Sequence, residues 1–101
     1  MIQVDMIVPI VDNDGNPLGD AHETIRSELL AIAGGYTMSD IQGKWLDGNT
    51  IYHDNSVSYR VIVDASALAC LRELAKSTCE RCRQECIAFS HHAINFELLG
   101  E

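Results

Sequence analysis

The sequence predicts an α+β fold in which two helices cover one face of an antiparallel sheet. Residues 2–11 alternate apolar and polar side chains, as a half-buried strand does. Two later segments, 20–33 and 66–83, repeat apolar residues at helical spacing. Between them, Asp47-Gly48-Asn49 separates two long strand-like runs, which is typical of a β-hairpin.

The length and charge of the chain limit what it can be. Its 101 residues are the size of one domain, so we expect a single domain over residues 1–101. It carries 15 acidic and 7 basic residues, a net charge of −8. Nucleic acids and anionic membranes bind clusters of Lys and Arg, so we expect neither as a partner. The first residues lack the basic and apolar parts of a signal peptide, and we therefore expect a cytoplasmic location.

The first strand is expected to bury its even-numbered apolar residues, from Ile2 to Ile10. Pro9 cannot donate a backbone hydrogen bond, so the strand has a bulge or lacks a neighbour there. Residues 12–17 then form a turn. They also resemble a calcium loop, but Gly15 stands at loop position 4, where an EF-hand needs its glycine at position 6.

The first helix is predicted to begin with a capping box, in which Asp20 is the N-cap and Glu23 follows three residues later. Its apolar stripe runs from Ala21 to Ile32, and we expect His22 on the helix surface. Gly34-Gly35 ends the helix.

The central hairpin is predicted to run from Tyr36 to Trp45 and back from Thr50 to Val63. Gly43 is a candidate for a bulge in the first arm. In the return arm, residues 57–63 form a strong strand, whereas His53-Asp54-Asn55-Ser56 is a poor strand former.

The second helix, residues 66–83, is capped by Asp64 or by Ser66. A short strand over 85–90 follows, and residues 93–98 form either a last strand or an extension that packs on a neighbour. The order β-α-β-β-α-β is that of the ferredoxin-like split βαβ fold.

The sheet face away from the helices would be bare in a single copy of this fold. We expect Ile7, Ile62, Val11 and either Tyr36 or Trp45 on this face. Another subunit would cover such a surface, so we expect a homo-oligomer, a dimer or a closed trimer, with the trimer favoured.

Four cysteines lie in the last third of the chain, at 70, 79, 82 and 86. The spacing Cys79-x2-Cys82-x3-Cys86, followed by His91-His92, suggests a zinc site. Cys79 and Cys82 also share a helix face with Leu71 and Ala75, where cysteine acts as a small apolar residue. We favour core cysteines and expect no metal.

Three polar clusters stand out: Tyr36-Thr37, Tyr52 to Ser56, and Gln84-Glu85. Each is either a solvated turn or part of one cleft, which could lie across a subunit boundary. They offer carboxylates, hydroxyls and an amide, without a Ser/His/Asp or Cys/His arrangement for nucleophilic catalysis.

Four motifs together resemble a group of small ferredoxin-like proteins to which the phage S-adenosylmethionine lyases are distantly similar. They are Gly35-Tyr36-Thr37, Gly43-Lys44-Trp45, Asp54-Asn55-Ser56 leading into Tyr59-Arg60-Val61, and Arg83 to Ile87. The resemblance covers residues 2–90 and implies active-site residues in the return arm and at the junction after the second helix. It implies catalytic roles for Asp54 and Glu85. The family position nearest Ser56 is acidic, so the chain departs from the family pattern there.

The resemblance also implies the ligand. S-Adenosylmethionine would lose methylthioadenosine when its own carboxylate attacks its γ-carbon, a reaction that needs no protein nucleophile and no cofactor. The substrate-binding residues would be Tyr36, Tyr52, Ser56, Tyr59 and Gln84. The alternative is a non-catalytic oligomer that binds a small nucleotide or metabolite, or a phage-type protein that binds a host factor. A phage-encoded protein would work in the host cytoplasm.

Overall fold

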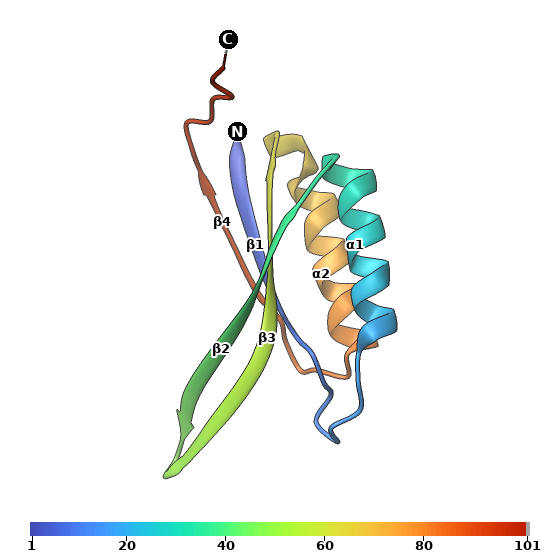
Figure 1. Cartoon of the computed structure of the whole chain (residues 1–101), viewed down its shortest axis with the longest axis vertical. Coiled ribbons are helices and arrows are strands. Elements are labelled where there is room, and N and C mark those ends of the chain that lie inside the picture. Colours follow the sequence, from blue (N-terminus) through green and yellow to red (C-terminus); the bar gives the residue numbers. More distant parts are fainter. Residues whose placement is uncertain (101) are drawn as a thin grey trace.

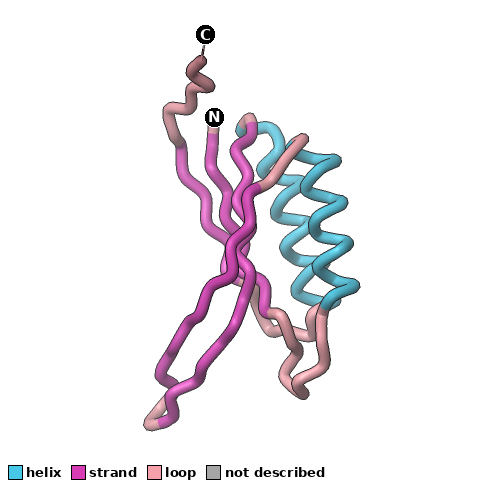
Figure 2. Tube along the Cα trace, in the orientation of Figure 1, coloured by secondary structure: helices cyan, strands magenta, loops and turns pink. Residues whose placement is uncertain are grey.

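The computed structural model describes residues 1–100 and confirms the α+β fold. The elements are β1 (Ile2–Pro9), α1 (Gly19–Ala33), β2 (Thr37–Asp47), β3 (Thr50–Val63), a short 3-10 helix (Ala65–Ala67), α2 (Leu68–Arg81) and β4 (Ala88–Ala93). The strands form one antiparallel sheet in the order β2-β3-β1-β4, and both helices cover the same face (Figures 1 and 2). This is the ferredoxin-like arrangement that the sequence predicts. No helix of the described part is long and apolar enough to span a bilayer.

The core lies between the sheet and the helices. The strands contribute alternate residues, and the helices contribute one stripe each. The most deeply buried members are Val4, Met6 and Val8 of β1, Ile25 and Leu29 of α1, Tyr59 of β3, Leu71 of α2 and Cys82 directly after α2.

Helix α1 begins earlier than the predicted capping box allows. Its N-cap is Leu18, without a side-chain cap, so the prediction that Asp20 is the N-cap was wrong. The cause lies in the preceding loop. There Val11 forms a β-bridge with Pro17, and the Leu18 N–H donates a hydrogen bond to the Ile10 carbonyl (3.1 Å). These interactions place buried Leu18 at the start of the helix. Asp20 falls in the first turn, where its charge still favours the helix dipole.

The Asp12 side chain holds together the predicted turn after β1. Its Oδ1 accepts hydrogen bonds from the backbone N–H groups of Asp14 (2.9 Å) and Asn16 (2.8 Å), and its Oδ2 accepts one from the Asn16 side chain (3.1 Å). The backbone N–H of Asn16 is the largest cause that lowers the pKa of this carboxyl. Before the second helix, Asp64 caps the short 3-10 helix, because its Oδ1 accepts from the Ser66 N–H (3.0 Å). Helix α2 itself begins after Ala67 without a side-chain cap, so the prediction that Asp64 or Ser66 caps it was wrong.

The central hairpin is more regular than predicted. Residues 53–56 lie within β3, because every residue from Thr37 to Asp47 has a partner there. Gly43 pairs directly with Asp54, so the predicted bulge is absent from this hairpin.

The last strand is shifted by three residues from the prediction. β4 spans Ala88–Ala93 rather than 85–90, because Arg83 takes a left-handed conformation (φ 53°) and the Gln84 N–H bonds back to the Cys79 carbonyl (3.0 Å). Residues 94–100 are not part of the sheet, so they form an extension rather than a last strand. That this extension packs on a neighbour stays a prediction.

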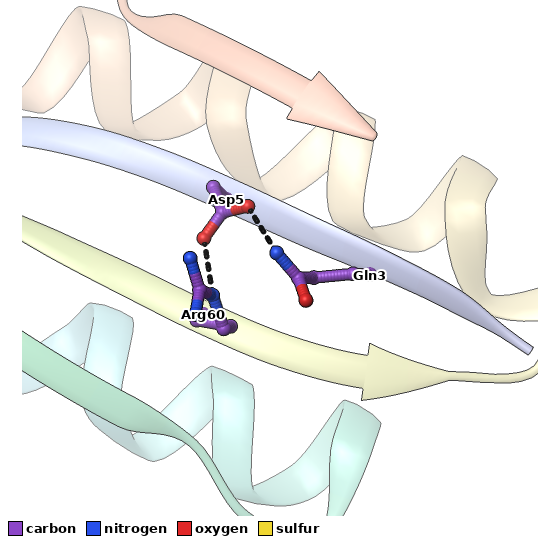
Figure 3. A network of polar contacts seen from close by, with 3 residues as sticks. All are labelled: Gln3, Asp5 and Arg60. Carbon is purple, nitrogen blue, oxygen red and sulfur yellow. Dashed lines mark hydrogen bonds and ion pairs between the residues drawn. The ribbon is translucent and has the colours of Figure 1, made fainter. Parts of the chain in front are cut away.

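The sheet face away from the helices carries Ile7 and Ile62, as predicted. Val11 lies in the loop instead, because β1 ends at Pro9. Tyr36 is also not on this face, since it packs against the core. Part of the face is polar: Asp5 accepts hydrogen bonds from Arg60 (2.9 Å) and Gln3 (3.0 Å) (Figure 3).

Candidate functional site

The outer half of the hairpin projects beyond the rest of the sheet as a two-stranded arm, which we define as residues 42–55 (Figure 1). The ladder between β1 and β3 ends where Pro9 pairs with Ser56, and one more bond joins the Ile10 N–H to the Asn55 carbonyl (3.2 Å). Beyond that point β2 and β3 have only each other as partners in the described chain.

Two predicted site residues, Tyr52 and Asp54, lie on this arm and are exposed. They share the face away from the helices, since both are even-numbered residues of β3, whose odd-numbered residues enter the core. Ser56 lies on the same face at the base of the arm. It is buried between its partners Pro9 on β1 and Ile41 on β2.

Tyr59 and Tyr36 form an aromatic pair on the helix side of the sheet. Their ring centroids are 6.0 Å apart, in an edge-to-face arrangement. Tyr59 is only 1% exposed, whereas Tyr36 is half-buried. Burial raises the pKa of the Tyr59 phenol, which therefore keeps its proton at neutral pH. Tyr36 is the member of the pair with surface open to a ligand.

His22 is buried against Tyr59, so its predicted place on the helix surface was wrong. Its Nδ1 lies 2.6 Å from the Tyr59 hydroxyl, and its Nε2 lies 2.8 Å from the Pro9 carbonyl oxygen. A carbonyl can only accept, so Nε2 carries a proton and donates to Pro9. In the tautomer with its only proton on Nε2, Nδ1 accepts from the Tyr59 hydroxyl. His22 thus joins α1, β3 and the end of β1 beside the base of the arm. The spacing to Ile25 and Leu29, three and seven residues on, was the signal in the sequence for this burial.

Gln84 and Glu85 lie in the loop between α2 and β4. The Gln84 side chain donates to the Cys82 backbone carbonyl (3.1 Å), and the backbone carbonyl of Gln84 accepts from the Cys79 thiol (2.9 Å). Gln84 therefore helps to close the loop, while exposed Glu85 takes part in no hydrogen bond or ion pair within residues 1–100.

The described chain does not join these clusters by itself. None of the side-chain hydrogen bonds and ion pairs within residues 1–100 joins the arm to the loop after α2. Two surface hollows of the described chain border the helices, and neither is lined by a predicted site residue. The arm and the loop after α2 remain open surfaces of one copy.

The cysteines differ in how deeply they are buried. Cys82 is fully buried in the core, and this burial raises the pKa of its thiol, whereas Cys70 and Cys86 are exposed. Within residues 1–100 no three His, Cys, Asp or Glu side chains are grouped as metal ligands. The packing of Cys82 confirms that this cysteine belongs to the core, whereas Cys79 is half-buried.

The fold, rather than the sequence, connects this chain with known proteins. No family model and no curated protein matches it. Among solved structures, the periplasmic divalent cation tolerance protein CutA from Archaeoglobus fulgidus superposes with a TM-score of 0.73 at 15% identity, over 97% of this chain and 88% of that one. CutA1 from Oryza sativa gives 0.67 at 17% identity, over 96% and 82%.

A phage S-adenosylmethionine lyase is also similar. Its complex with S-methyl-5′-thioadenosine superposes with a TM-score of 0.65 at 14% identity, over 90% of this chain and 79% of that one. At these identities the likeness establishes a shared fold. It extends over 90% or more of this chain in each comparison.

Proposed function

We propose that the protein is an S-adenosylmethionine lyase that works as a homo-oligomer, with its site between subunits. The observation that carries this proposal is the projecting arm, which holds Tyr52 and Asp54 away from the rest of the chain. An isolated two-stranded hairpin is at best marginally stable in water, so the arm needs a covering surface.

A second copy of the chain is the proposed cover. Leu46 and Ile51 are cross-strand partners on the arm, and they are 69% and 61% exposed. Exposed apolar pairs of this kind mark interaction surfaces. A closed ring, with a trimer favoured, would let each arm meet the bare sheet face of a neighbour that carries Ile7 and Ile62.

The side chains of the proposed site suit the lyase reaction. The substrate carboxylate attacks its own γ-carbon, the bond from that carbon to sulfur breaks, and sulfur keeps the electron pair. Neutral methylthioadenosine leaves, and homoserine lactone remains. The protein has to hold the carboxylate in line with the breaking bond, which proximity and orientation can accelerate strongly. Asp54, with Tyr52 beside it on the arm, and Glu85 would bind the positive groups of the substrate. Tyr36 lies on the other face of the sheet, so it would contact the adenine from a neighbouring chain.

The experiment is incubation with S-adenosylmethionine, followed by chromatography for methylthioadenosine. A protein-free sample corrects for spontaneous breakdown. The variants Asp54→Asn and Glu85→Gln should each lower the rate, while Glu23→Gln, an exposed acid on α1, should not. If the wild-type protein forms no methylthioadenosine above the protein-free sample, the lyase proposal is wrong.

A second candidate is a non-catalytic oligomer that binds a small nucleotide or metabolite. Ser56 favours it, because this residue stands where the resemblance implies an acidic side chain. A thermal-shift panel of nucleotides separates the two candidates: stabilisation without turnover supports the binding protein, and turnover supports the lyase.

A further inference from the structure

The two faces of the arm differ in chemistry. Pairing through the arm is regular, so residues directly opposite each other share a face. The face away from the helices holds the pairs Gly43 with Asp54, Trp45 with Tyr52, and Asp47 with Thr50. The other face holds Gln42 with Asn55, Lys44 with His53, and Leu46 with Ile51. One face is therefore aromatic and acidic, and the other is aliphatic and basic.

The aromatic and acidic face has open space beside its carboxylate. Opposite Asp54, Gly43 has no side chain, and no atom lies within 4 Å of where a Cβ would stand. Trp45 is the next residue of β2 on this face, so its indole lies diagonally across from Asp54. Trp45 is 63% exposed and its partner Tyr52 is 48% exposed.

Such a surface is suited to a weakly hydrated cation. The π faces of Trp and Tyr attract positive charge, with Trp the stronger, and a neighbouring carboxylate adds to this attraction. An anion would be repelled by Asp54 and Asp47 here and would find Lys44 on the opposite face.

We infer that Trp45, together with Tyr52 and Asp54, recognises the sulfonium of the ligand. This inference rests on the proposed function and adds a specificity-determining residue, Trp45, to the site. The positive charge on sulfur disappears as its bond to carbon breaks, so the contact with Trp45 is stronger in the bound substrate than in the transition state. Trp45 should therefore strengthen binding without increasing the rate of the chemical step.

The test compares two ligands that differ in charge, S-adenosylmethionine and neutral methylthioadenosine. Calorimetric titration of the full chain at low temperature gives the affinity for each. Trp45→Leu should weaken S-adenosylmethionine binding by about 3- to 30-fold, the range for a cation–π contact. It should change methylthioadenosine binding by less than about 2-fold, and Trp45→Phe should recover part of the loss.

Two controls are the steady-state kinetics of the Trp45→Leu variant and a substitution on the opposite face of the arm. Trp45→Leu should raise KM and leave kcat unchanged or higher. Lys44→Gln should leave the ratio of the two affinities unchanged, because Lys44 lies on the other face; tighter sulfonium binding in this variant would overturn the inference.

Fluorescence adds a measurement on the unaltered protein. Trp45 is the sole tryptophan of the chain, so its emission reports this face directly. S-Adenosylmethionine should change the emission more than methylthioadenosine does. If the wild type binds S-adenosylmethionine but its emission and the Trp45→Leu affinities do not distinguish the two ligands, this inference is wrong and the proposed function stands. If the wild type binds no S-adenosylmethionine at all, both are wrong.

Discussion

The hydrogen bond between Tyr59 and His22 gives the sharpest prediction about the architecture. Tyr59→Phe removes the hydroxyl and keeps the ring in the core. The Nε2 proton of His22 is still needed by the Pro9 carbonyl, so the imidazole cannot change tautomer to compensate. Nδ1 becomes a buried acceptor without a partner, since His22 is 5% exposed. Such a loss costs about 1–3 kcal/mol, and we expect a decrease in the free energy of unfolding of about 2 kcal/mol.

The assay is urea denaturation followed by circular dichroism, at one fixed protomer concentration because assembly would change the apparent stability. Tyr52→Phe makes the same chemical change on the exposed arm and should cost less than about 0.5 kcal/mol. The double variant Tyr59→Phe with His22→Leu should lose less free energy of unfolding than the two single variants lose together, by about 1 kcal/mol. If Tyr59→Phe lowers the free energy of unfolding no more than Tyr52→Phe does, the hydrogen bond between Tyr59 and His22 does not stabilise the fold. The same conclusion follows if the losses from Tyr59→Phe and His22→Leu are additive.

Thiol reactivity, acid stability and assembly provide three further tests. Iodoacetamide should label exposed Cys70 readily and leave buried Cys82 unmodified until the protein unfolds, as followed by mass spectrometry; equal rates would contradict the burial. The carboxyl of Asp12 has a lowered pKa when folded, so its stabilisation is present above the unfolded value near 3.8 and is lost as the pH falls through the lower folded value. Asp12→Asn should therefore lower the Tm at neutral pH and reduce its fall below about pH 4; an unchanged acid profile would refute this. Leu46→Asp should shift light-scattering mass toward that of one chain, and an unchanged assembly would show that the arm is not the interface.

The elements could be predicted because their signals are local. Alternation along residues 2–9 and the helical stripes reflect burial on one side, and Gly34 ends α1 with the positive φ (76°) that glycine readily adopts. Boundaries were less predictable where distant groups decide them. Asp20 has the sequence of an N-cap, but bonds across the preceding loop move the start of α1 to Gly19.

The candidate site was less predictable than the fold, for a similar reason. A histidine beside a predicted cap appears solvated until Tyr59, 37 residues away, supplies its partner. The polar run around Asp54 appeared unfit for a strand, yet it pairs fully because β2 continues alongside it. Whether Asp54 and Glu85 bind the same ligand depends on how two copies of the chain contact each other. No local pattern in the sequence indicates those contacts.

Mixing two variants tests most directly the central proposal, that the site is completed between chains. Asp54→Asn and Glu85→Gln are purified separately, unfolded together and refolded at equal amounts, and methylthioadenosine formation is measured. If each site takes Asp54 from one chain and Glu85 from its neighbour, about one site in four in the mixture regains both carboxylates, and activity exceeds that of either variant alone. Activity no higher than the mean of the two parents would contradict a site shared between subunits.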